Sequence, residues 1–143
     1  MWSVCTPRSN EVFTECALIG KNLSRLLQPA ILAVLKAEAE PLHGYVIVQR
    51  IADSPMYGGL KPDAAGVYRT LAQMERDELV TSTWDTSQHG PAKKCYSITE
   101  AGELAMTRWV DTLGCYMDAI GELRGMICDS LQVEVPEHHP CCG

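Results

Sequence analysis

The sequence predicts a mainly α-helical (α+β) protein with one small antiparallel β-ribbon. Three observations support this prediction: helical spacing of apolar residues in three short segments, two β-branched runs around a turn-forming stretch, and a long apolar seam near the C-terminus. The 143 residues suit one domain, and an apolar fraction of 46% is sufficient for a buried core. With a single phenylalanine, that core must be mostly aliphatic.

One helix is expected before Pro41 and a second one after it. Residues 30–40, AILAVLKAEAE, favour a helix with Pro29 in its first turn, and Pro41 should end it. Residues 44–52 then favour a second helix. The apolar residues expected to be buried in this second helix are Tyr45, Val48 and Ile51.

A third helix is expected over residues 64–78, after a loop rich in glycine and proline at residues 54–63. Asp63 can cap it, because an aspartate side chain accepts hydrogen bonds from the free backbone N–H groups of a first turn. Its apolar stripe consists of Val67, Leu71 and Met74.

Two strands and a long helix complete the predicted order. Residues 79–84 and 93–98 favour strands, and a polar loop with Gly90-Pro91 joins them as a hairpin. Thr99 can then cap a helix over residues 100–132. Apolar residues recur along this helix at spacings of three and four: Met106, Trp109, Leu113, Tyr116, Ile120, Leu123 and Ile127. Such a seam usually packs against another helix of similar length, so we expect a homodimer.

This order divides the chain into four parts. An N-terminal arm or helix comes first, the three helices and the ribbon follow, and the dimerisation helix precedes a tail that contains cysteine and histidine. The expected boundaries are 1–28, 29–99, 100–132 and 133–143.

Three helices followed by a two-stranded wing is the order of a winged helix-turn-helix, in which the third helix enters the major groove of DNA. Base contacts need side chains near the start of that helix, whereas phosphates need cations and free N–H groups. The expected base-contacting residues are Gly66, Tyr68, Arg69, Thr70 and Gln73. The expected backbone-contacting residues are His43, Tyr45, Lys61, Lys93 and Lys94. Packing between helices is the competing role for the two tyrosines, and an ordinary solvated pair is the competing role for the last two lysines.

The formal net charge of −6 would by itself disfavour a nucleic-acid partner. Its distribution removes that objection. Residues 41–99 contain six acidic and six basic side chains, so the negative charge lies in the flanking segments. A local basic face is therefore compatible with the composition.

Three motifs in this order also resemble a known family. PLHGY, AGVYRTLAQMERDELV and GPAKKCYSITEAGE are similar to the PadR family of bacterial transcriptional regulators, over about residues 29–125. The resemblance implies a homodimeric winged helix that binds operator DNA, usually as a repressor, and is released by a small phenolic or hydrophobic effector. Trp109 on the seam could line the effector cavity. The chain departs from the pattern where Gly66 replaces threonine, Arg69 proline, Glu78 glycine and Cys95 tyrosine, and these departures concern the operator sequence rather than the fold.

The tail VPEHHPCCG is not explained by this fold. It supplies four ligands suited to zinc or copper(I), so a metal- or thiol-sensing regulator is an alternative function. Adjacent cysteines close a tetrahedral site poorly, and Cys5 or Cys16 could complete it; a frayed terminus is the simpler reading. The candidate ligands are His138, His139, Cys141 and Cys142.

Other function classes find little support. The sequence contains none of the common hydrolase, P-loop, dithiol or zincin motifs, so we expect no enzyme, and it identifies no cofactor. It has neither a stretch of ~20 apolar residues nor a signal peptide, and its seven cysteines are an odd number without scaffold spacing. We therefore expect a cytoplasmic protein with free thiols and no membrane partner. A winged helix that binds only protein remains an alternative.

Overall fold

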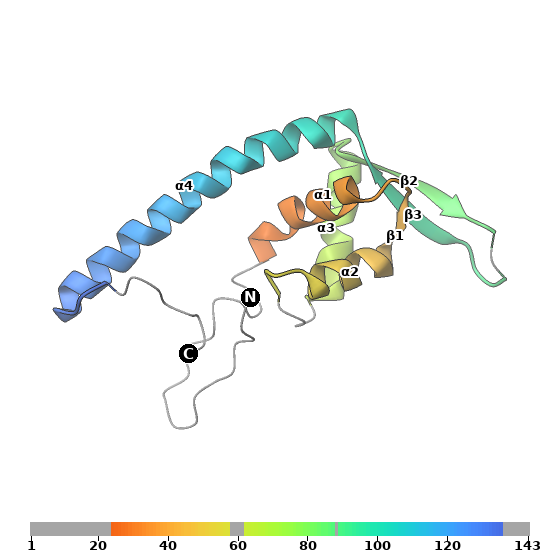
Figure 1. Cartoon of the computed structure of the whole chain (residues 1–143). Coiled ribbons are helices and arrows are strands. Elements are labelled where there is room, and N and C mark those ends of the chain that lie inside the picture. Colours follow the sequence, from red (N-terminus) through yellow and green to blue (C-terminus); the bar gives the residue numbers. More distant parts are fainter. Residues whose placement is uncertain (1–23, 58–61, 88, 136–143) are drawn as a thin grey trace, which may run out of the picture.

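The computed structural model describes residues 24–57, 62–87 and 89–135. Within these ranges the chain forms four helices and a three-stranded sheet (Figure 1). The elements are α1 (Leu27–Ala37), β1 (Leu42–His43), α2 (Gly44–Asp53), α3 (Ala64–Arg76), β2 (Val80–Asp85), β3 (Lys93–Ile98) and α4 (Glu100–Leu131). The predicted order of three helices, hairpin and long helix is confirmed.

The three short helices surround an aliphatic core. Helix α3 buries the predicted stripe completely, because its members lie one turn apart on one face. The largest fully buried side chains are Ile31 and Leu32 of α1, Ile47 and Ile51 of α2, Val67, Leu71 and Met74 of α3, and Val80 of β2. Tyr57 and Tyr96 also belong to this core.

The structure corrects two details of the first helices. Helix α1 ends at Ala37 rather than at residue 40, and the Glu38 N–H donates to Leu35 O. Tyr45 is 54% exposed, so its predicted burial is wrong. Because α2 begins at Gly44, its inward face passes through Ile47 and Ile51, and Tyr45 lies on the flank of the helix.

The sheet contains one strand more than the predicted two-stranded wing. Its order is β1-β3-β2 with antiparallel pairing throughout. In strand β1, Leu42 pairs with Tyr96, and His43 pairs with Cys95. A two-residue strand is too short to show the alternation of apolar and polar residues by which strands are predicted. Its pairing with β3 is what identifies it as a strand.

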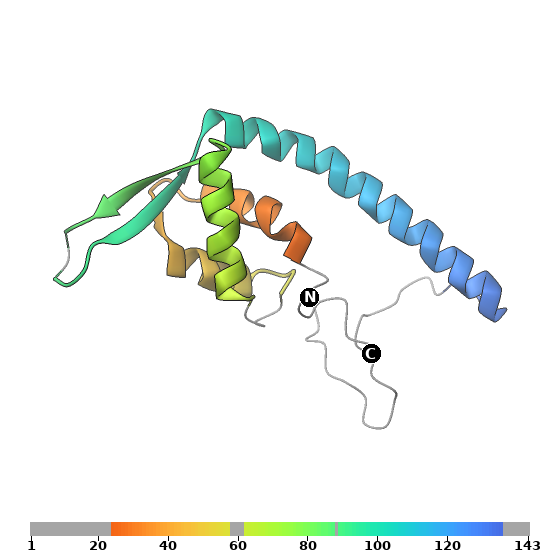
Figure 2. The same ribbon diagram turned by 180° about the vertical axis from the view of Figure 1, so that it is seen from behind.

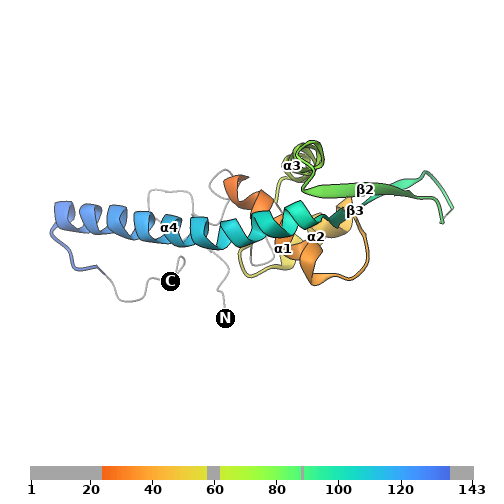
Figure 3. The same ribbon diagram turned by 90° about the horizontal axis from the view of Figure 1, so that it is seen from above.

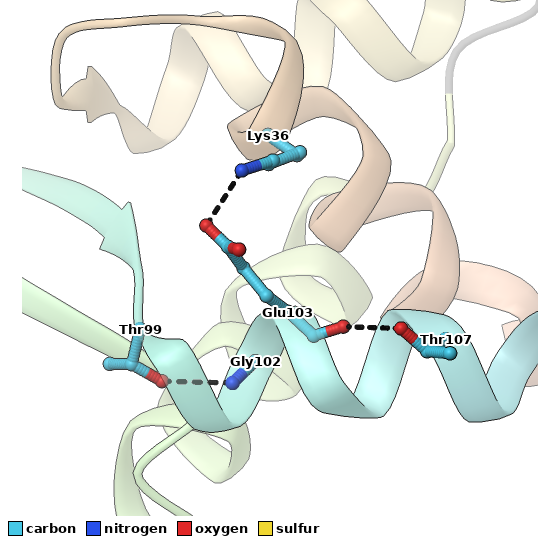
Figure 4. Close-up of polar contacts among 5 residues, drawn as sticks. All are labelled: Lys36, Thr99, Gly102, Glu103 and Thr107. Atoms are coloured by element: carbon cyan, nitrogen blue, oxygen red, sulfur yellow. Dashed lines mark hydrogen bonds and ion pairs between the residues drawn. The ribbon is translucent and has the colours of Figure 1, made fainter.

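The junction between the wing and α4 is held by a compact set of polar contacts (Figure 4). Thr99 caps α4 as predicted, since its Oγ1 accepts from Gly102 N at 3.0 Å and also donates to Glu78 O at 2.7 Å. Lys36 of α1 and Glu103 of α4 form an ion pair of 2.7 Å. The two Thr99 hydrogen bonds connect the start of α4 to the turn that follows α3.

Helix α4 extends away from the body, in the direction opposite to the wing (Figure 3). Among the described residues, the first part of α4 packs against the core through half-buried Met106 and Trp109, and Cys128 near the end of the helix is also buried. The Trp109 Nε1–H donates to Gln28 Oε1 at 3.1 Å. From Tyr116 onward the predicted seam is exposed, and it includes Ile120 at 66% exposure.

The turn between α3 and β2 contains a strained residue. Glu78 has φ of 60°, the left-handed region that suits glycine. This is the position where the resemblance leads one to expect glycine. The strain at a side-chain-bearing residue costs about 1 kcal/mol.

Gly102 allows the closest backbone approach at the α4 junction, so replacing it should be costly. A Cβ at this position would overlap the carbonyl oxygen of Leu79 and crowd Ile98 Cγ1. Because a backbone carbonyl cannot move aside freely, we expect Gly102→Ala to lower the free energy of unfolding by about 2 kcal/mol in urea titrations.

The matched control for this change is Gly121→Ala in the same helix, where a Cβ would meet no atom within 4 Å. This variant should be stabilised by up to about 1 kcal/mol through its higher helix propensity. Equal stabilities for the two variants would contradict the proposed close approach at Gly102.

Candidate nucleic-acid interface

The outer face of α3 is exposed because its apolar stripe points into the core. Figure 2 shows this helix on the near side of the body, beside the wing. Asp63 caps it as predicted, accepting from Gly66 N at 3.1 Å. The same Asp63 oxygen lies 3.3 Å from Arg69 Nη2, in an ion pair whose side chains are both largely exposed. Such a pair contributes little to stability, so the guanidinium remains available to another anion.

Tyr68 joins the start of α3 to the start of α2. Its ring lies so close to Gly44 that a Cβ there would be 2.5 Å from Tyr68 Cε1. The ring is nevertheless 44% exposed. The packing and surface roles considered from the sequence therefore coexist in this tyrosine, and its contact explains why position 44 carries glycine.

Thr70 and Gln73 are engaged within α3. Thr70 is half-buried, and its hydroxyl donates to Gly66 O at 2.8 Å. The Gln73 amide donates to Asp77 Oδ1 at 3.0 Å and accepts from Arg76 Nη2 at 2.8 Å. Arg76, exposed and close to Gln73, is a cation of this face that the sequence analysis missed; its position three residues after Gln73 was the available signal.

His43, Tyr45 and Lys93 form a cluster where β1, α2 and the wing meet. The rings of His43 and Tyr45 are stacked with centroids 5.5 Å apart, and Lys93 Nζ lies 5.0 Å from the centroid of Tyr45. His43 Nε2 donates to Asp85 Oδ2 at 2.9 Å. Hydrogen bonds from Ser87, and then the one from His43, lower the pKa of Asp85 to about 2.

Lys93 and Lys94 lie on opposite faces of the sheet. Lys94 Nζ is 2.9 Å from Glu75 Oε2 of α3 and 5.6 Å from the ring centroid of Tyr96. The hydrogen bond from Lys94 lowers the pKa of Glu75, and the same bond raises the pKa of Lys94. The alternation of a strand explains the separation: one lysine faces outward, and the other ties the wing to α3.

Five residues of the predicted sites lie outside the described residues. They are Lys61, His138, His139, Cys141 and Cys142. The possible completing ligands Cys5 and Cys16 also lie there. Among the described cysteines, Cys95, Cys115 and Cys128 are free thiols, and burial together with the negative charge of Asp85 raises the pKa of Cys95.

Residues 31–108, more than half of the chain, match the model of the transcriptional regulator PadR-like family. The chain belongs to this family. Its members are transcriptional regulators rather than enzymes, as predicted. No curated protein matches the chain significantly.

Solved structures with PadR-like folds resemble the chain over most of its length. A PadR family transcriptional regulator from Eggerthella lenta is 26% identical, with a TM-score of 0.55, and the match covers 71% of this chain and 84% of that one. A PadR-like regulator from Bacillus cereus is 22% identical, with a TM-score of 0.57 and coverage of 73% and 96%. A transcriptional regulator from Clostridium thermocellum is 18% identical, with a TM-score of 0.62 and coverage of 73% and 96%. The last two likenesses bear on the fold alone.

A helix must be both long and apolar to span a membrane. None of the helices in the described part of the chain combines the length and apolarity needed to cross a bilayer.

The ion pair between Lys94 and Glu75 makes stability depend on acid pH. Because the folded pKa of Glu75 lies below its ordinary 4.5, its stabilising effect is full above that pH and is lost as the pH falls through the lowered value. We expect Lys94→Met to lower the free energy of unfolding at neutral pH by less than about 1 kcal/mol, since the pair is partly exposed.

The difference between wild type and Lys94→Met should shrink as the pH falls through the lowered pKa of Glu75, because the carboxylate then becomes protonated in both proteins. Lys93→Met is the control, because Lys93 lies over Tyr45 and not beside Glu75. Denaturant titrations at several pH values measure the effect. A difference that stays constant with pH would rule out the assigned pair.

Proposed function

We propose that the protein binds operator DNA as a homodimer, with α3 in the major groove and the wing along the phosphate backbone. The observation that carries this proposal is the exposed first half of α3, whose Tyr68 and Arg69 side chains lie on the surface opposite the buried stripe. Its cap at Asp63 and its small Gly66 allow the helix start to approach a base pair closely.

The structure supports different roles for the residues of this surface. Tyr68, Arg69 and Gln73 are suited to base edges because all three are exposed. The contacts of Arg69 with Asp63 and of Gln73 with Asp77 join exposed side chains and are weak. Lys93, with His43 and Tyr45 beside it, is suited to a phosphate. Thr70 and Lys94 are weaker candidates, because each has a partner within the protein. Lys61 completes the proposed backbone contacts from the sequence alone.

Dimerisation through α4 follows from its uncovered apolar side chains. A helix of 32 residues is about 48 Å long, and among the described residues its contacts with the core lie near its beginning. The exposed apolar residues in its second half are Tyr116, Met117, Ile120, Leu123, Met126, Ile127 and Leu131. A monomer rarely leaves such a continuous surface in water, and a second α4 has the matching length. Met106, Trp109 and Leu113 would form the end of this interface nearest the body.

Regulation would act through the separation of the two recognition helices. Two α3 helices must lie about 34 Å apart to enter successive major grooves on one side of DNA. A small phenolic or hydrophobic effector at the dimer seam, near Trp109, would favour another separation of these helices and so release the operator. The protein would then act as a repressor of transcription in the absence of the effector. The cytoplasm is the compartment that this function implies. Sensing through the tail remains the alternative input.

The phosphate role of Lys93 can be measured without knowing the operator. For Lys93→Ala we expect weaker binding to mixed-sequence duplex DNA, and a slope of log affinity against log salt that is smaller by about 1. Lys36→Ala is the matched control, because it removes an equal charge from the α1–α4 ion pair. Equal slopes for the two variants would exclude the contact.

Selection of bound sequences from random DNA tests the proposed function itself, and failure to enrich any palindrome would count against it.

The dimer can be tested at the centre of the exposed surface. We expect Ile120→Glu to raise the dissociation constant of the dimer at least tenfold, because each copy loses about 1.5–3 kcal/mol of apolar burial and gains a desolvated charge. Glu122→Gln, on another face of α4, should leave it unchanged. Sedimentation velocity over a range of concentrations separates these results, and a wild type that stays monomeric at high concentration would refute the dimer.

A further inference from the structure

One face of the small sheet gathers three metal-binding side chains from its three strands. His43 of β1 is the register partner of Cys95 in β3. Asp85 of β2 lies two residues after Thr83, the partner of Cys95 on the other side, so its side chain shares this face. A nitrogen of His43, a carboxylate oxygen of Asp85 and the Sγ of Cys95 all lie within 4.8 Å of one another.

These side chains are not an ordinary solvated group. Cys95 is buried, and the side chains of His43 and Asp85 are 16% and 25% exposed. Metal bonds of 2.0–2.3 Å place tetrahedral ligands roughly 3.3–3.7 Å apart. The three side chains therefore need only small movements to surround one ion.

The surroundings orient the ligands. The Ser87 N–H donates to Asp85 Oδ1 at 2.9 Å, which leaves Oδ2 directed at His43. Stacking against Tyr45 holds the imidazole ring of His43. Outer contacts of this kind, which fix the direction of each ligand, accompany metal sites in proteins.

We propose that His43, Asp85 and Cys95 form a binding site for a divalent transition metal, with zinc as the preferred ion. A thiolate excludes magnesium and calcium as natural occupants, and a carboxylate disfavours copper(I). Imidazole, carboxylate and thiolate together suit zinc, with a fourth position open to water. On binding, the Cys95 thiol proton is released to solvent, and the imidazole proton of His43 exchanges from Nε2 to Nδ1. His43 Nε2 and Asp85 Oδ2 then coordinate the ion in place of their mutual hydrogen bond.

The site differs from the metal candidate in the C-terminal tail, and it has a mechanical consequence. The ion would connect β1, next to α2, with the wing strands β3 and β2. An occupied site would thus hold the wing in a fixed position against the body. This consequence for DNA binding rests on the proposed function, whereas metal binding does not.

Cobalt(II) titration of the reduced full-length protein tests the site, because a cysteine ligand produces a thiolate-to-cobalt charge-transfer band. The background is Cys141→Ser/Cys142→Ser, which removes the tail thiols. We expect one equivalent of cobalt to give the band, zinc to displace it, and Cys95→Ser to abolish it. Cys115→Ser, which removes an exposed thiol on α4, is the matched control and should keep the band.

A second variant keeps the test decisive if Cys95→Ser does not fold, as judged by circular dichroism. Asp85→Asn retains a side chain of the same shape, and we expect it to weaken cobalt binding at least tenfold. An absent band in the background protein, a band that survives Cys95→Ser, or an unchanged affinity in Asp85→Asn would each overturn the proposal.

DNA binding provides a separate result. If zinc binds as described and strengthens DNA binding, both proposals stand. If zinc binds and selection still enriches no DNA sequence, the proposed function fails while the metal site stands.

Discussion

The arrangement of this protein depends on the contact between the start of α4 and the end of α3. Thr99 bonds to the carbonyl oxygen of Glu78 through its hydroxyl and to that of Leu79 through its N–H, and Gly102 lies against the latter. Strand β2 begins at this point, strand β3 ends there, and α4 follows directly. A change in the direction of α4 must therefore move the C-terminal end of α3 as well. If α4 forms the dimer, this contact is the route by which the interface sets the spacing of the two α3 helices.

The elements whose signals are local could be predicted from the sequence. Asp63 and Thr99 are caps because each bonds to an N–H group three residues away, and the stripe of α3 follows from helical periodicity. The features that failed depend on distant partners. Strand β1 exists only because β3 lies beside it, and without β1 the proximity of His43 and Cys95 could not be foreseen.

The candidate site shows the same division. Exposure of Tyr68 and Arg69 followed from the buried stripe on the opposite face of α3. The separation of the two wing lysines followed from strand alternation and was available in principle. The pairing of Lys94 with Glu75 could not be predicted from the sequence, because it depends on how the wing packs against α3. Tyr45, expected in the core, instead supports the His43 ring and Lys93 at the surface.

The left-handed backbone at Glu78 has an evolutionary consequence. Because most side chains would experience a similar strain there, exchanges among them should be nearly neutral for the stability of the turn. Glycine and asparagine stand apart, since both adopt this conformation readily. Many residues could therefore replace one another at this position with little effect on the free energy of unfolding. A change to glycine would raise that free energy, and the gain would let the protein tolerate a mildly destabilising substitution in the recognition surface.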